Sequence, residues 1–241
     1  MRKILCIISL LVFISCQKDL KTKDIISDLK VTPNVVDADG SSLVSVSVVL
    51  NDRAATDKRN VVFTTTGGNW IDGKNGKITV TATYQDGEIL AKANLTAPAS
   101  AGIITITAAS ESTTLNGDYN LSATVTANKV EPTVIKLEPS SFGIGANFTT
   151  EDTLVAKITG LNNNNASKGV TVLFEDLNGN NPAGGRFRAV QATSGAGSTV
   201  SAIYGAPALS IGTPITIRVT VLDKNSVKTT ISDATTLTIN K

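Results

Sequence analysis

Apolar residues occupy every second position along much of this chain of 241 residues. Val44, Val46 and Val48, for example, alternate with Ser45 and Ser47. The same alternation recurs over residues 78–83, 121–127, 154–158, 170–174 and 215–221. Because successive side chains of a β-strand point to opposite faces, this period indicates half-buried strands. Turn-forming Gly, Asn and Asp separate the stretches, so we predict an all-β chain of antiparallel β-sandwiches.

Short segments repeat along the chain at an almost constant distance. The repeated pairs are Pro33 and Pro139, residues 61–63 and 172–174, and residues 104–106 and 215–217. Their offsets are 106, 111 and 111 residues. Offsets that stay near one value and drift slightly indicate two copies of one fold with loop insertions. We therefore predict two tandem sandwiches, residues 25–129 and residues 130–241, with Pro132 stiffening the joint.

The chain begins with Met-Arg-Lys and continues with an apolar run of 11 residues, 4–14. A helix of that length cannot span roughly 30 Å of hydrocarbon, whereas a basic start before a short apolar core is typical of a secretory signal. Residues 13–16, Phe-Ile-Ser-Cys, resemble the lipobox of bacterial lipoproteins, although Phe13 replaces the usual Leu. This resemblance implies that residues 1–15 are a signal peptide and that Cys16 is acylated.

Gln17, Lys18 and Asp19 directly follow this cysteine. They resemble a short export signal that sends lipoproteins of some Gram-negative bacteria to the outer face of the outer membrane. The resemblance implies an outer-membrane protein, held by lipid and facing the cell exterior, with residues 16–24 as the lipidated cysteine and tether. The other interpretation is that the three residues form only a charged tether.

Composition excludes several classes of function. Removal of residues 1–15 takes away Arg2 and Lys3 and leaves 20 Lys and Arg against 20 Asp and Glu. A neutral chain without a basic run gives no electrostatic basis for binding nucleic acid. The sequence has no His. The lipobox resemblance implies that Cys6 would leave with the signal peptide and that Cys16 would be acylated, so no disulfide, thiol nucleophile or Cys/His metal site is expected. A Ser nucleophile would lack its usual His base, and the alternative of a Ser–Lys dyad is disfavoured because the hydroxyls lie in strand alternation. We predict no enzyme, no catalytic residue and no cofactor.

The first copy carries motifs of a known family. Residues 37–42 read Asp-Ala-Asp-Gly-Ser-Ser, and residues 61–68 form a Thr-rich strand that ends in two glycines. Residues 91–108 combine a Leu-Thr strand, an Ala-Gly turn and an Ile-Thr strand. In these motifs the copy resembles the bacterial immunoglobulin-like domains of the invasin/intimin type. The resemblance implies tandem sandwiches used as a rigid stalk or adhesin arm, and it fixes no ligand. In the second copy Gly-Ile-Gly at residues 143–145 stands where the Asp-Gly turn is expected.

Two groups of oxygen-bearing side chains have the chemistry that Ca²⁺ prefers. They are Asp37 with Asp39, and Asp176 with Asn178, Asn180 and Asn181. The second group lacks a terminal bidentate Glu at a suitable spacing. We favour the interpretation that these side chains form turns, and we predict no metal site.

Three other positions have two interpretations each. Trp70 either stacks on a sugar ring or caps the core, and we favour the core. Glu151 and Asp152 point to opposite faces of a strand, so we expect a solvated start of the strand instead of an acid–base pair. Asp-Thr-Leu at residues 152–154 resembles a short O-glycosylation signal on exported proteins of some Gram-negative bacteria, which makes Thr153 a candidate for modification.

An N-terminal anchor makes the second copy distal to the membrane. The loops expected at its free end are residues 139–150, 176–186 and 205–213. The candidate binding residues in the first two loops are Phe142, Phe148, Asp176, Asn178, Asn180, Asn181 and Arg186. Aromatic and Arg side chains are frequent anchors of binding sites. The alternative is that Phe142 and Phe148 only plug the end of the sandwich. Residues 162–165 are expected to face the first copy.

These features predict a non-catalytic surface lipoprotein that acts as an adhesive or spacer module. Its predicted partners are the membrane, through lipid, and a protein or glycan on the cell exterior. One alternative is a glycan-binding accessory lipoprotein of a nutrient-uptake system, for which Trp70, Tyr84, Tyr119 and Tyr204 would have to supply the aromatic platforms. Another alternative is a subunit of a larger surface assembly.

The lipid anchor is directly testable at Cys16. Mass spectrometry of the N-terminal peptide should show cleavage before Cys16 and lipid attached to it. Cys16→Ser should release or mislocalise the protein, because two or three acyl chains, at about 0.8 kcal/mol per buried CH₂, would be lost. Cys6→Ser is the matched control and should leave localisation unchanged. An unmodified Cys16 would contradict the prediction of a lipid anchor.

Overall fold

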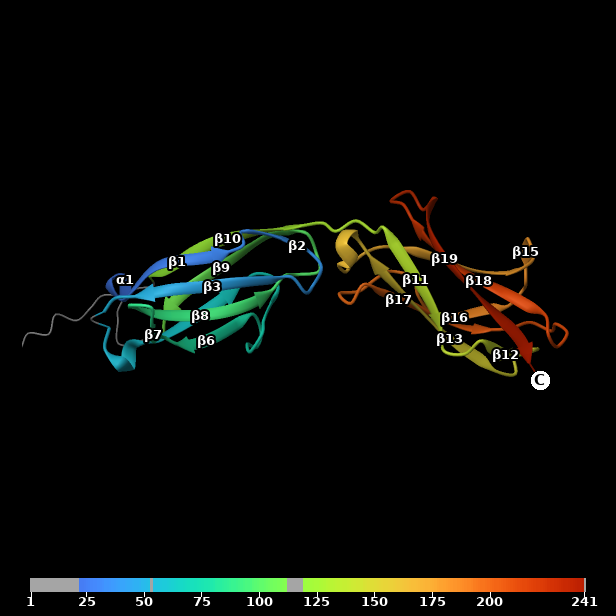
Figure 1. Ribbon diagram of the computed structural model, residues 1–241, viewed down its shortest axis with the longest axis horizontal. Coiled ribbons are helices and arrows are strands. Elements are labelled where there is room, and N and C mark those ends of the chain that lie inside the picture. Colours follow the sequence, from blue (N-terminus) through green and yellow to red (C-terminus); the bar gives the residue numbers. More distant parts are fainter. Residues whose placement is uncertain (1–21, 53, 112–118, 241) are drawn as a thin grey trace, which may run out of the picture.

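Figure 1 shows the computed structural model, which describes residues 22–52, 54–111 and 119–240. Within these ranges the only helical segments are α1 (Thr22–Ile25), η1 (Thr56–Lys58) and η2 (Leu161–Asn163), each of three or four residues. The predicted all-β fold is confirmed. Cys16 and the triplet Gln17, Lys18 and Asp19 lie outside the described residues, so their roles stay predictions.

Residues 26–128 form the first sandwich. Its strands are β1 (Ile26–Thr32), β2 (Val35–Asp37), β3 (Leu43–Leu50), β4 (Asn60–Thr65), β5 (Asn69–Trp70), β6 (Lys77–Thr81), β7 (Thr83–Gln85), β8 (Glu88–Thr96), β9 (Gly102–Ser110) and β10 (Asn120–Asn128). One sheet has the order β1-β3-β8-β5, with β7 also paired to β8, and the other has the order β2-β10-β9-β4-β6. The short strand β2 runs parallel to β10, whereas the other described pairs are antiparallel.

Residues 134–240 form the second sandwich, which lies end to end with the first along the long axis of Figure 1. Its strands are β11 (Val134–Pro139), β12 (Gly143–Gly145), β13 (Glu151–Thr159), β14 (Val172–Asn178), β15 (Asn181–Pro182), β16 (Arg186–Gln191), β17 (Thr199–Gly205), β18 (Pro214–Leu222) and β19 (Lys228–Asn240). The two sheets have the orders β11-β13-β17-β16 and β12-β19-β18-β14-β15. Again only the short second strand, β12, runs parallel to its neighbour, β19.

The internal repeat is visible in the strand register. Phe63 on β4 lies opposite Ala108 on β9, and Phe174 on β14 lies opposite Val219 on β18. Phe174 follows Phe63 by 111 positions, and Val219 follows Ala108 by the same 111 positions. The two sandwiches therefore share sheet order and register, as the sequence offsets predict.

One expectation for the second copy is wrong. Gly143–Gly145 does not replace the Asp-Gly turn, because β12 pairs with the last strand as β2 does in the first copy. The turn follows β12 and contains Asn147 and Phe148, both with positive φ (55° and 59°). In the first copy the corresponding turn contains Gly40, with φ 73°. The turn is thus conserved in place and built from different residues.

Each sandwich has its own core of buried side chains. The first core extends from Ile25 to Ala127 and the second from Ile135 to Ile239, and the two clusters share no residue. The side chains are mainly Val, Ile, Leu and Ala on alternating positions, as in β3 and β8. Full burial of one Val, Leu or Ile side chain stabilises by about 1.5–3 kcal/mol, so these faces hold the sheets together.

Each core also contains an aromatic pair at an equivalent place. In the first sandwich Trp70 packs against Phe63 with ring centres 5.8 Å apart, and its Nε1–H donates to the Gly76 carbonyl at 3.0 Å. In the second, Phe187 packs against Phe174 at 6.0 Å. Trp70 is buried, so the interpretation as a core residue is confirmed and a sugar platform at this position is wrong.

Expressed alone, residues 25–129 should fold and melt cooperatively with a β-type circular dichroism spectrum, because all residues of the first core lie within them. Thermal denaturation followed at two wavelengths would test this. The limits of the two domains remain predictions until then. A disordered fragment would show that the first sandwich needs the second.

Gly185→Ala should lower the free energy of unfolding by about 1–3 kcal/mol, the usual effect of overpacking. A Cβ at Gly185 would lie 2.2–2.5 Å from atoms of the Tyr204 ring and hydroxyl. Gly195→Ala is the matched control, because a Cβ there meets nothing within 4 Å. Equal denaturant midpoints for the two variants would contradict the close packing at Tyr204.

Candidate functional site

The predicted distal loops do gather at the end of the second sandwich, away from the first (Figure 1). In the turn after β12, the N–H of Phe148 donates to the Ala206 carbonyl at 2.8 Å, and the N–H of Asn147 donates to the Pro207 carbonyl at 3.0 Å. Phe142 accepts the N–H of Thr238 near the end of β19 at 2.9 Å. These backbone bonds tie the loop of residues 139–150 to its neighbours.

Two phenylalanines of this end are exposed. Phe142 is 69% exposed and Phe148 is 39% exposed. The guanidinium carbon of Arg186 lies 4.8 Å from the centre of the Phe148 ring, a cation–π contact worth about 0.5–1 kcal/mol at an exposed site. Among the described residues Arg186 has no carboxylate partner, whereas Arg188 pairs with Glu151. The alternative that Phe142 plugs the sandwich end is wrong, because its side chain faces solvent.

The Asp176 carboxylate accepts hydrogen bonds inside the loop of residues 176–186 and from the core residue Tyr204. Its Oδ2 accepts the N–H of Gly185 at 2.6 Å and the hydroxyl of Tyr204 at 3.0 Å. Burial, and then the charge of Asp176 and the hydrogen bond to it, raise the pKa of Tyr204, so this phenol stays a hydrogen-bond donor. Asp176 therefore fixes the loop that presents Arg186.

The asparagines of the candidate calcium group form a turn. Asn178 and Asn181 are register partners at the tip of the β14–β15 hairpin, and both are exposed, as is Asn180. Asp176 points away from them toward Tyr204. Among the described residues, no three Asp, Glu, Cys or His side chains converge as a metal site would require. The three asparagines thus lie at an exposed hairpin tip, whereas Asp176 bonds to Gly185 and Tyr204, so that turn formation by these side chains stays a prediction.

Asp39 in the first copy also forms a turn. Its Oδ1 accepts the N–H groups of Ser41 and Ser42 at 2.8 and 2.7 Å, and its Oδ2 accepts the Ser42 hydroxyl at 2.9 Å. Burial raises the pKa of Asp39, but the hydrogen bonds from Ser42 and Ser41 outweigh burial and lower it below the ordinary value. A lowered pKa means that ionised Asp39 stabilises the fold at neutral pH, and this contribution is lost as the pH falls through the folded-state pKa.

The expectation of a solvated strand start at residues 151–152 is half wrong. Glu151 is exposed, but Asp152 is only 2% exposed and occupies the place that Val44 has in the first copy. Its Oδ1 accepts the hydroxyl of Ser140 and, at 3.1 Å, the N–H of Ser141, while its Oδ2 has no partner in the described part of the chain. Asp152 thus anchors the loop between β11 and β12.

Thr153, the candidate for glycosylation, lies on the exposed face of β13. Its backbone N–H donates to the Ser140 hydroxyl at 3.1 Å, and its side chain points away from the core. This position leaves the hydroxyl accessible, and modification of Thr153 stays a prediction.

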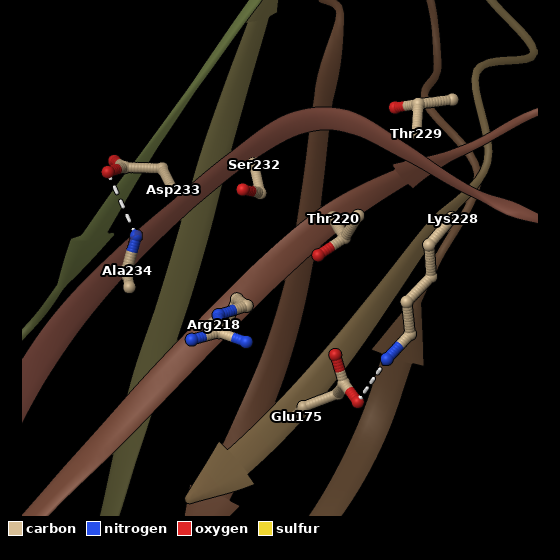
Figure 2. Close-up of a pocket in the computed structure, with 8 residues that line it drawn as sticks. All are labelled: Glu175, Arg218, Thr220, Lys228, Thr229, Ser232, Asp233 and Ala234. Atoms are coloured by element: carbon tan, nitrogen blue, oxygen red, sulfur yellow. Dashed lines mark hydrogen bonds and ion pairs between the residues drawn. The ribbon is translucent and has the colours of Figure 1, made fainter. Parts of the chain in front are cut away.

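An open trough of about 570 Å³ lies on the flank of the second sandwich (Figure 2). It is formed on the outer face of the sheet by β14, β18 and β19, and a β-bulge after Thr220 increases the local twist. The residues that line it include Glu175, Arg218, Thr220, Lys228, Ser232 and Asp233. Sequence reasoning missed this site because its charges are scattered over 59 positions and only the register brings them together.

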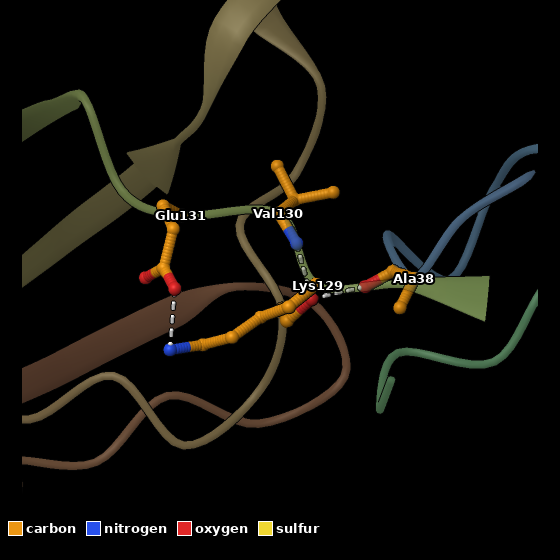
Figure 3. A network of polar contacts seen from close by, with 5 residues as sticks. Ala38, Lys129, Val130 and Glu131 are labelled. Atoms are coloured by element: carbon orange, nitrogen blue, oxygen red, sulfur yellow. Dashed lines mark hydrogen bonds and ion pairs between the residues drawn. The ribbon is translucent and has the colours of Figure 1, made fainter. Parts of the chain in front are cut away.

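A second feature missed from the sequence is the joint between the sandwiches (Figure 3). The hydroxyl of Ser167, from the second sandwich, donates to the Ala38 carbonyl of the first at 2.7 Å. It also accepts the N–H of Val130 in the connecting segment at 2.9 Å. Ser167 is buried, and Lys129 forms an exposed ion pair with Glu131 at 2.8 Å beside it.

Other hydrogen bonds cross the same joint. They run from Asn164 Nδ2 to Asp37 Oδ2 (2.8 Å), from Asn165 Nδ2 to the Asp39 carbonyl (3.2 Å) and from the Lys168 N–H to the Ala99 carbonyl (2.8 Å). The prediction that residues 162–165 face the first copy is confirmed for Asn164 and Asn165. A Cβ at Gly160 would lie 2.3 Å from Val130 Cγ1, so the connecting segment packs closely.

No helix among the described residues combines the length and the apolar character that a membrane span requires.

Comparison with known proteins identifies the fold. No known protein family and no curated protein matches the sequence. Among solved structures, invasin is 18% identical with a TM-score of 0.55, over 89% of this chain and 39% of that one. InvE of Yersinia pseudotuberculosis is also similar: it is 18% identical with a TM-score of 0.41, over 91% of this chain and 61% of that one. FdeC of Escherichia coli is 14% identical with a TM-score of 0.36, over 90% of this chain and 66% of that one. The chain thus has the tandem immunoglobulin-like fold of invasin, as its motifs predict.

Proposed function

We propose that this chain is a non-catalytic, surface-exposed outer-membrane lipoprotein that acts as an adhesive immunoglobulin-like module. Lipid on Cys16 would hold the start of the chain at the membrane, and the distal end of the second sandwich would meet a protein partner. The observation that carries this proposal is the pair of exposed phenylalanines, Phe142 and Phe148, with Arg186 over the second ring.

Phe142 and Phe148 differ in their exposure from the other aromatic residues of the second sandwich. Of its other aromatic rings, Phe174 and Tyr204 are buried in its core and the partly buried Phe187 packs against that core. Leaving Phe142 in water is unfavourable for an isolated chain, and aromatic and Arg side chains are frequent anchors of protein interfaces. The distal end therefore has the chemistry of a docking surface.

The joint supports the role of an arm. A Ser167→Ala change would leave a buried carbonyl at Ala38 and a buried N–H at Val130 without this partner, at a cost of about 1–3 kcal/mol each. Bonds of this kind hold the second sandwich in one orientation relative to the first. An arm with a fixed joint keeps its tip away from its anchored start, which suits both adhesion and spacing.

The likeness in fold supports a protein as the partner. Invasin is described as a bacterial integrin-binding protein, and this chain spans 39% of its length. We infer from the shared fold that the present chain also presents an immunoglobulin-like surface to a protein.

The alternatives have less support. A glycan-binding accessory lipoprotein needs aromatic platforms, but Trp70 and Tyr204 are buried, which leaves Tyr84 and Tyr119 on the first sandwich. An enzyme is disfavoured, because the sequence contains no His that could act as a general base. At the distal end Glu151 is engaged by Arg188 and Asp176 by Tyr204. A subunit of a larger surface assembly remains compatible with the same distal surface.

Photo-crosslinking on intact cells tests this proposal. Full-length protein carrying p-benzoylphenylalanine at Phe142 should give a protein adduct, whereas the same probe at Ile103 should not. Ile103 is a matched control, because it is 73% exposed and lies on the first sandwich. Adding Phe148→Ser and Arg186→Gln should lower the adduct yield about tenfold, as expected when anchors of an interface are lost.

The same experiment distinguishes the alternatives. Equal protein adducts from positions 142 and 103 would contradict a distal docking surface. A strong protein adduct from a probe at Asn164, and none at Phe142, would move the site to the joint. A glycan adduct would favour the nutrient-uptake alternative. Protease treatment of the intact cells should remove the protein, since the proposal requires exposure on the cell surface.

A further inference from the structure

We propose that the flank trough of the second sandwich is a second binding site, which takes a carboxylate side chain from an acidic segment of a partner protein. This inference goes beyond the proposed distal surface and uses different residues. Its central group is Arg218, on the outer face of β18 (Figure 2).

The carboxylates that line the trough are already engaged. Glu175 on β14 pairs with Lys228 on β19 at 2.6 Å. Asp233 turns toward the sandwich edge, where its Oδ2 accepts the N–H of Leu137 at 2.8 Å and its Oδ1 accepts the N–H of Ala234 at 2.9 Å. Arg218 therefore keeps its guanidinium without an ion pair among the described residues, even though Glu175 is its register partner.

Two hydroxyl groups, of Thr220 and Ser232, line the same space as this guanidinium. Thr220 is only 4% exposed and forms the floor of the trough, and its hydroxyl has no hydrogen bond within the described residues. Ser232 lies opposite Thr220 on β19. Figure 2 shows both hydroxyls and the Arg218 guanidinium around the same space, with the Lys228–Glu175 pair at one side. The trough thus offers several unused donors to an acceptor-rich ligand.

The first sandwich provides an internal comparison. By register, Thr64 and Thr107 stand where Glu175 and Arg218 stand in the second copy. The two threonines share a hydrogen bond of 2.5 Å between their hydroxyls. The polar side chains at these two positions of the first sandwich therefore have partners in each other. Ala109 takes the place of Thr220. The charged trough with a free guanidinium is therefore a property of the second copy and not of the fold.

The chemistry of the trough selects its ligand. A guanidinium binds a carboxylate through two parallel N–H···O bonds. The four charged lining residues, Glu175, Arg218, Lys228 and Asp233, sum to zero, so a single negative charge suits the site better than a phosphate dianion. No aromatic ring lines the trough, and a sugar ring would find no surface on which to stack. An Asp or Glu side chain of a protein satisfies these conditions.

Binding of the purified full-length protein to an immobilised peptide of six glutamates tests this site, with a peptide of six glutamines as the reference. Arg218→Gln should weaken binding to the glutamate peptide about tenfold. Glu175→Gln should strengthen it several-fold, because the ammonium of Lys228 becomes available. Lys157→Gln removes an equal charge from β13, in the other sheet of the same sandwich, and should change binding less than twofold.

Phe142→Ser should leave binding of the glutamate peptide unchanged, which separates this site from the proposed distal surface. Equal binding by the native protein and the Arg218→Gln variant would overturn the proposal, and so would equal binding to both peptides. Stronger binding to a glucuronate oligomer than to the glutamate peptide would show that the occupant is an acidic sugar, contrary to the proposal.

Discussion

The hydroxyl of Ser167 is the polar contact on which the arrangement of the two sandwiches most depends. It lies buried between them and bonds at once to the Ala38 carbonyl and the Val130 N–H. Each of these backbone groups would otherwise be left unpaired away from water, which is strongly unfavourable. The direction in which the distal loops and the flank trough face therefore depends on this side chain together with the hydrogen bonds of Asn164, Asn165 and Lys168 across the joint.

Much of the fold could be predicted from the sequence, because strands and repeats leave local patterns. The alternation in β3 is read directly from neighbouring residues, and the offset of 111 between Phe63 and Phe174 survives in the register. Asp152 could not be placed in this way. A carboxylate on a core position is stabilised because Ser140 and Ser141, twelve and eleven residues earlier, donate hydrogen bonds to it.

The candidate sites show the same division. The distal loops were predictable, because the order of strands in a sandwich decides which loops share an end. The flank trough could not be predicted from the sequence. Arg218 is left without an ion pair because Glu175 pairs with Lys228 instead, and this pairing depends on the fold. Similarly, nothing local marks Ser167 as a joint residue, because its partners lie 129 and 37 positions away. Long-range polar pairs depend on the fold and leave no periodic trace in the sequence.

The hydrogen bond from the Leu137 N–H to the Asp233 carboxylate has a consequence for contacts between copies of the chain. β11 is an outer strand of its sheet, and an open outer strand is a template for pairing with a strand of another chain. Asp233 occupies one of its amides. At the opposite margin of the same sheet, the irregular register of β16 between Arg188 and Gln191 interrupts the ladder. At both edges of this sheet, pairing with a strand of a neighbouring copy is thereby disfavoured.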